Sequence, residues 1–103
     1  MKIVEIDVFQ HDLPVKDAPY RMGVQEVRHL DTTIVRLECD DGTVGYGETC
    51  PLGSTYQPQH ALGVRAALAE MAPHLIGLDP TAVGRVNAAM DATLMGHRYA
   101  KAA

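Results

Sequence analysis

The stretch GYGETCPLGSTY, residues 45–56, gathers an acid, a thiol and several glycines, and it is the densest group of residues suited to chemistry. It begins like the dinucleotide-binding pattern G-x-G-x-x-G, but Cys50 occupies the sixth position and Pro51 follows it. That pattern needs a glycine there and a helix directly behind it, whose N-terminus binds the pyrophosphate. Glu48 and Cys50 lie close together, yet no histidine stands in register to activate a nucleophile. The stretch therefore predicts no self-contained active site.

The histidines and cysteines do not form a metal-binding motif. The chain contains five histidines and two cysteines, which are His11, His29, His60, His74, His97, Cys39 and Cys50. Because H-x-H, H-E-x-x-H and C-x-x-C spacings are all missing, no metal or redox site is predicted. We expect surface or helix-capping histidines, two buried or half-buried thiols, and no cofactor bound by these residues alone.

Composition and charge limit the class of protein. The chain has 103 residues, of which 47% are hydrophobic and 21% charged, and its formal net charge is -4. This length supports one domain with one hydrophobic core. No basic run indicates nucleic-acid binding, and no apolar stretch is long enough for a membrane span or a signal peptide. We therefore expect a cytoplasmic protein that binds neither nucleic acid nor membranes.

Alternating apolar and polar residues predict two strands early in the chain. Residues 2–9 place Val4, Ile6 and Val8 on one face and acidic residues on the other. Residues 32–39 alternate in the same way. Both segments are expected to form half-buried strands.

A turn connects the second strand to a third one. Residues 40–42 read Asp-Asp-Gly, and an Asp-Gly pair tolerates the positive φ that tight hairpins require. Residues 43–49 must then return antiparallel as the third strand. Such a meander has one apolar face, which needs a cover.

The second half of the chain predicts that cover. Apolar residues recur at steps of three and four, at Ala61, Val64, Leu68, Met71 and Leu75. This spacing predicts an amphipathic helix that begins near Gln59 and ends near Pro73 and Gly77.

A second helix is predicted to begin at Pro80, with Asp79 as its N-cap, and to continue to Gly96. Its apolar stripe consists of Val83, Val86, Met90 and Leu94. The side chains expected to be largely buried in the two helices are Val64, Leu68, Met71, Val83, Val86 and Met90. Residues 97–103 contain good helix formers and end without a cap.

Two irregular loops are the best candidates for recognition. The first strand is expected to stop at residues 11–14, and residues 12–23 form a long loop that carries Tyr20. In residues 45–56, glycines allow the backbone to bend or to approach another backbone closely. Tyr56 either caps the first helix or binds a small amphiphilic or cationic ligand through its aromatic face.

The order of these elements resembles the N-terminal capping domain of the enolase superfamily, of the mandelate racemase/muconate lactonizing enzyme type. The resemblance covers residues 1–103 and rests on the strand, long loop, strand, DDG, strand order, followed by GYGETCPLGSTY, ALAEMAPHLIGLDP and MGHRYAKAA. It implies an α+β fold, in which a three-stranded antiparallel meander is followed by a helical segment. The (β/α)8 barrel of such enzymes has no counterpart in these residues.

Some stretches are similar to enzymes that act on proline derivatives, namely DLPVKDAPYRMG, GETCPLGSTYQPQHALGVRAALAEMAPHLIG and GHRYAKAA. Those enzymes are hydroxyproline betaine or proline betaine epimerases and cis-3-hydroxyproline dehydratases. The resemblance implies the specificity cap of a Mg²⁺-dependent epimerase or dehydratase, and it leaves the reaction open because barrel groups decide it. The alternative is a stand-alone binding or interaction module that reuses the cap fold.

The resemblance also implies partners and site residues. A barrel of about 250 residues would follow the cap and supply the acid/base lysines and the Asp/Glu ligands of Mg²⁺. The chain would then contain no catalytic residue and no metal ligand, end inside the helix that leads into the barrel, and be homo-oligomeric at full length. Tyr56 and Tyr20 are the implied substrate-binding residues for a small amino acid. Lys101, in the linking helix, is expected to face solvent.

Overall fold

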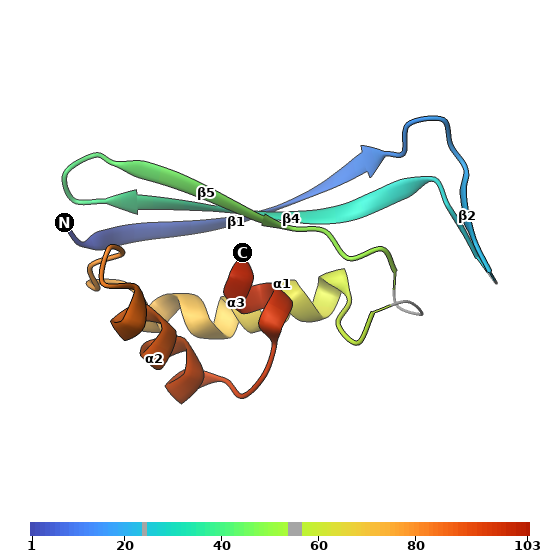
Figure 1. The fold of residues 1–103 in the computed structure, drawn as a ribbon. Helices are drawn as coiled ribbons and strands as arrows, with labels where there is room; N and C mark the ends of the chain where they lie inside the picture. Colours follow the sequence, from blue (N-terminus) through green and yellow to red (C-terminus); the bar gives the residue numbers. More distant parts are fainter. Residues whose placement is uncertain (24, 54–56) are drawn as a thin grey trace.

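The computed structural model describes residues 1–23, 25–53 and 57–103. These residues form a sheet of antiparallel strands with helices packed on one of its faces (Figure 1). The α+β fold predicted from the sequence is confirmed.

The main sheet consists of β1 (Ile3–Pro14), β4 (His29–Cys39) and β5 (Val44–Thr49), in the spatial order β1-β4-β5. Both neighbouring pairs are antiparallel, so the predicted meander is confirmed. The hairpin between β4 and β5 turns at Gly42, whose φ of 85° is readily adopted by glycine. The predicted turn at residues 40–42 is therefore also confirmed.

The first strand is longer than predicted, because it continues through residues 11–14 instead of ending there. β1 pairs with β4 as far as Pro14 opposite His29, with Leu13 opposite Leu30 along the way. Polar residues such as His11 interrupt the apolar alternation but still form backbone ladder bonds with their neighbours. Side-chain pattern alone therefore underestimated the length of the ladder.

The face of β1 that packs on the core changes near its start. The register between β1 and β4 shifts between Ile3 and Glu5, which indicates a β-bulge at this position. Ile3 is 1% exposed, whereas Val4 is 52% exposed. The prediction that Val4 shares the buried face with Ile6 and Val8 is wrong, because the extra residue reverses the alternation.

The prediction that residues 12–23 form one long irregular loop is wrong. A second, two-stranded sheet pairs β2 (Tyr20–Met22) with β3 (Gln25–Val27). It lies beyond the end of the helical layer (Figure 1). Val27 is buried and anchors this small hairpin.

Helix α1 (Ala61–Met71) begins close to the predicted start and is followed by the 3₁₀ turn η1 (Ala72–His74). Val64 and Met71 are each 1% exposed, and Leu68 is also buried. The predicted core face of this helix is confirmed. Its stripe packs with Val35 of β4 in the main core.

Helix α2 (Val83–Thr93) begins later and ends earlier than predicted. Asp79 does not cap it: the Asp79 carboxylate accepts hydrogen bonds from the backbone N–H and the hydroxyl of Thr81, at 2.9 and 2.7 Å. These local bonds form a turn that competes with a helix start at Pro80. Val83 consequently lies in the first turn and is 60% exposed, so its predicted burial is wrong. Met90 is buried and Val86 is partly buried against the core.

Helix α3 (Arg98–Ala102) packs against α1 and β5, and the chain end lies below the sheet (Figure 1). The prediction that Lys101 faces solvent is wrong. Its side chain is 15% exposed, and its ammonium lies 2.9 Å from the carboxylate of Asp91. Ala103 lies directly against Gly47, where a Cβ would collide with its backbone. The predicted close approach of another backbone at this glycine is confirmed.

Candidate functional site

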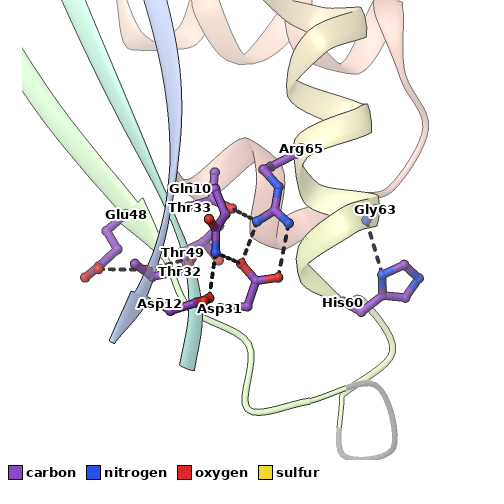
Figure 2. A network of polar contacts seen from close by, with 10 residues as sticks. All are labelled: Gln10, Asp12, Asp31, Thr32, Thr33, Glu48, Thr49, His60, Gly63 and Arg65. Carbon is purple, nitrogen blue, oxygen red and sulfur yellow. Dashed lines mark hydrogen bonds and ion pairs between the residues drawn. The ribbon is translucent and has the colours of Figure 1, made fainter. Parts of the chain in front are cut away.

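A polar cluster joins α1 to the sheet near the end that carries the loops (Figure 2). The Arg65 guanidinium donates to both carboxylate oxygens of Asp31, at 2.8 and 3.1 Å, and to the Thr33 hydroxyl at 3.1 Å. The Gln10 amide donates to Asp31 at 3.0 Å and to Asp12 at 2.7 Å. The bidentate pair therefore fixes the angle of α1 on β4, and Gln10 extends the contact to β1.

Electrostatics favour the charged forms of both members of the pair. The hydrogen bonds from Arg65 lower the pKa of Asp31, partial burial opposes this, and the Gln10 amide adds to the lowering. The same contact raises the pKa of Arg65. The cluster is therefore an ion pair at neutral pH and holds no proton for acid or base catalysis.

A second contact positions the acidic end of β5. The Thr32 hydroxyl, which is fully buried, donates to the Glu48 carboxylate at 2.7 Å (Figure 2). Its oxygen also lies 3.3 Å from the carbonyl of Thr49. This anchors β5 where the chain leaves the sheet toward residues 50–56.

A shallow pocket of about 200 Å³ opens next to the polar cluster. Its lining combines two imidazoles and a carboxylate with apolar groups, from His29, Asp31, Pro51, Leu52, Gly53, His60, Ala61 and Leu62. His60 also caps α1, because its Nδ1 accepts the Gly63 N–H at 3.2 Å (Figure 2). A predicted helix-capping role for a histidine is confirmed here. The pocket can accommodate part of a small polar molecule.

Sequence comparison identifies the family of this fold. Residues 3–103 match the family described as "Mandelate racemase / muconate lactonizing enzyme, N-terminal domain". The chain belongs to this family. The resemblance noted in the sequence is thereby confirmed.

Relatives of this N-terminal domain are much longer proteins. Cis-3-hydroxy-L-proline dehydratase from Roseibium aggregatum is 53% identical over 99% of this chain, which spans 28% of that protein. An enolase-superfamily member from Roseovarius nubinhibens, solved in complex with magnesium, matches with a TM-score of 0.88 and 43% identity, over 96% of this chain and 26% of that one. A mandelate racemase/muconate lactonizing enzyme from the same organism gives a TM-score of 0.92 at 35% identity, over 96% and 27% of the two chains. The domain thus spans about a quarter of the length of these relatives.

The two predicted substrate-binding tyrosines differ in what the structure describes. Tyr20 lies on β2 opposite Val27 and is 53% exposed. Tyr56 lies outside the described residues. The predicted role of each residue therefore stays a prediction.

The described part of the N-terminal domain offers no group of three or more His, Cys, Asp or Glu side chains placed to hold a metal ion.

Cys39 and Cys50 are free, the first buried and the second half-buried, as predicted. Burial, helped by the charges of Asp41 and Asp40, raises the pKa of the Cys39 thiol. In residues 1–23, 25–53 and 57–103, no helix is long and apolar enough to cross a membrane.

Sequence reasoning missed the pair of Asp31 and Arg65. Arg65 follows the core residue Val64, and its partner is distant in the sequence. No local pattern joins two such residues. Asp31 and Thr33, two positions apart on β4, both accept from Arg65, but polar residues at this spacing in a strand do not by themselves indicate a shared partner.

Proposed function

We propose that residues 1–103 form the capping domain of a Mg²⁺-dependent enolase-superfamily enzyme that acts on a proline-type amino acid, with cis-3-hydroxy-L-proline as the substrate. The observation that carries the proposal is the 53% identity to cis-3-hydroxy-L-proline dehydratase over 99% of this chain. Dehydration is favoured over epimerisation because this relative is a dehydratase. A C-terminal (β/α)8 barrel would follow in the full-length protein, beginning after α3.

The division of work between cap and barrel follows from the residues. Magnesium bound in the full-length enzyme would supply positive charge that makes removal of the α-proton of an amino acid carboxylate easier. The described residues of this chain do not fit a magnesium site, because they bring no three ligands together. In this proposal, the barrel supplies the metal ligands and the acid/base groups, as the resemblance to the family implies, and the cap supplies no catalytic residue.

The cap would contribute exclusion of water and recognition. Enolisation is easier in a site shielded from water, and a domain that covers the mouth of a barrel can provide such a shield. Tyr20 is half exposed on a hairpin at the end of the molecule, where it is free to contact another group. A ring ammonium over the face of Tyr20 or Tyr56 would gain about 0.5–2 kcal/mol from cation–π attraction.

The test is an assay of the full-length protein with cis-3-hydroxy-L-proline, proline betaine and hydroxyproline betaine. We expect magnesium-dependent loss of water from the first substrate and no epimerisation of the betaines. Turnover of a betaine alone would move the assignment to an epimerase. Because the proposal assigns the acid/base groups and the metal ligands to the barrel, we expect the 103-residue chain to be inactive on its own.

A stand-alone binding module that reuses the cap fold is the competing class of function. A reading frame that continues beyond Ala103 into a barrel with acid/base lysines would exclude it. The full-length protein is further proposed to be a cytoplasmic homo-oligomer, which size-exclusion chromatography with light scattering would examine.

A further inference from the structure

Two glutamines that precede α1 reach across to α3. The Gln57 amide oxygen accepts the Leu52 N–H at 2.7 Å, and its amide nitrogen donates to the Tyr99 hydroxyl at 3.1 Å. The Gln59 amide oxygen accepts the Tyr99 N–H at 2.9 Å. Tyr99 is thus bound at both its backbone and its side chain by one short segment.

Each bond at Gln57 uses a different end of its amide. Leu52 and Gln57 lie on either side of residues 53–56, so the first bond links the two flanks of that stretch. The second bond fixes the linked flanks to a residue 42 positions further along the chain. An amide can do both because it carries an acceptor and a donor, whereas an aliphatic side chain of similar length can do neither.

Gln59 serves the start of α3. Helix N-termini leave backbone N–H groups without intrahelical partners. His97, at the N-cap position of α3, makes no side-chain capping bond and has a left-handed backbone conformation. Gln59 supplies the acceptor that this helix start lacks, from outside the helix. The start of α3 and the segment before α1 therefore stabilise each other.

We propose that Gln57 and Gln59 form a clasp on Tyr99 that makes the positions of Leu52 and Gln57 depend on α3, and that Gln57 is a positioning residue for substrate selection. The functional part rests on the proposed function, because Tyr56 is the neighbour of Gln57 and the proposed substrate contact. The clasp itself rests only on the three hydrogen bonds, all of which are partly buried. Partial burial makes such bonds stronger than exposed ones.

The clasp is tested by amide hydrogen exchange of the full-length protein. Tyr99→Phe removes only the hydroxyl, so it leaves the Leu52 N–H and its acceptor chemically unchanged. If the clasp couples them, the Leu52 amide should exchange about three- to tenfold faster in this variant, the range expected for one lost hydrogen bond. Gln57→Met should accelerate Leu52 at least as much. In the double variant that combines Tyr99→Phe with Gln57→Met, the Leu52 amide should exchange no faster than in Gln57→Met alone.

Two controls separate coupling from general loosening. Tyr46→Phe removes a hydroxyl from a tyrosine that is 71% exposed on β5, and it should leave Leu52 exchange unchanged. The Val64 amide, which donates to the His60 carbonyl at 3.0 Å, reports on α1. Unchanged Leu52 exchange in Tyr99→Phe, or equal acceleration at Val64, would overturn the clasp. In Gln57→Glu the carboxylate can accept from both the Leu52 N–H and the Tyr99 hydroxyl, so the Leu52 amide should exchange as slowly as in the wild type.

The positioning role has its own readout. With cis-3-hydroxy-L-proline, Tyr99→Phe should raise KM about three- to tenfold while kcat changes less than about twofold. Faster Leu52 exchange with an unchanged KM would overturn the positioning role and leave a purely structural clasp. A wild-type protein that does not dehydrate this substrate would contradict the proposed function instead, and hydrogen exchange would still decide the clasp.

Discussion

Asp31 shows how one side chain sets the geometry of a whole interface. It accepts two bonds from Arg65 on α1 and one from Gln10 on β1, while itself belonging to β4. The carboxylate is the common acceptor of donors on two other elements. Its loss should therefore affect both stability and its dependence on pH.

Asp31→Asn should lower the free energy of unfolding by about 1 kcal/mol at pH 7, a value reduced for the 41% exposure of the Asp31 side chain. The pKa of Asp31 is lowered in the folded state, so its contribution is fully present above the ordinary value of about 3.9 and is lost as pH falls through the folded value. The stabilities of the wild type and the variant should converge as the pH falls through the lowered pKa of Asp31. Urea unfolding at pH 7, 5 and 3 measures this. Asp17, whose side chain is exposed, provides the matched control: the difference in unfolding free energy between Asp17→Asn and the wild type should stay about the same at the three pH values.

His60 provides a second prediction at the residue scale. His60→Ala removes the acceptor for the Gly63 N–H and should lower the free energy of unfolding by about 1 kcal/mol, whereas His60→Asn should preserve it. His74, which is exposed at the end of η1, is the matched control, and its change to alanine should have little effect. Thermal and urea unfolding provide the comparison. Equal losses in both alanine variants would contradict a specific capping role.

At the scale of elements, local patterns predicted most strands and helices, and competition between local signals accounts for the errors. Alternation and the Asp-Asp-Gly turn were sufficient for β4 and β5. At Asp79 two local structures compete, and the turn with Thr81 prevails over a helix cap. The bulge near Val4 and the pairing of β2 with β3 depend on partners elsewhere in the chain, as does the ion pair of Asp31 with Arg65. Such contacts have no signature in a single segment.

Packing of α3 against β5 gives a prediction for two glycines of one strand. A Cβ at Gly47 would collide with the backbone of Ala103, whereas a Cβ at Gly45 meets no described atom within 4 Å. Gly47→Ala should therefore lower the free energy of unfolding by about 1–3 kcal/mol through overpacking, and Gly45→Ala should change it by less than about 0.5 kcal/mol. Urea denaturation of the paired variants tests this. Similar values for both would show that the end of α3 moves away freely.

At the scale of the whole molecule, the helices cover one face of the sheet and the hairpin of β2 and β3 extends beyond them (Figure 1). The pocket beside His60 and the glutamines that hold Tyr99 both belong to the connection between β5 and α1, and the polar cluster shares Asp31 with that pocket. A rigid sheet and helix pair thus supports the loops from which recognition is proposed. This arrangement suits a cover whose rim selects the substrate.

The two tyrosines proposed for that rim are tested in the full-length protein. Tyr56→Ala should lower kcat/KM for cis-3-hydroxy-L-proline at least about tenfold, which corresponds to about 1.4 kcal/mol of transition-state stabilisation. Tyr20→Ala should produce a smaller decrease in the same direction, since its hairpin is held by few contacts and can readjust. Tyr46→Phe, on the exposed side of β5, serves as the control that should leave kcat/KM unchanged. An unchanged kcat/KM in Tyr56→Ala, with unfolding curves that match the wild type, would contradict a role for Tyr56 in substrate binding. A decrease in both tyrosine variants with stability intact would support aromatic recognition of the ring ammonium by the cap.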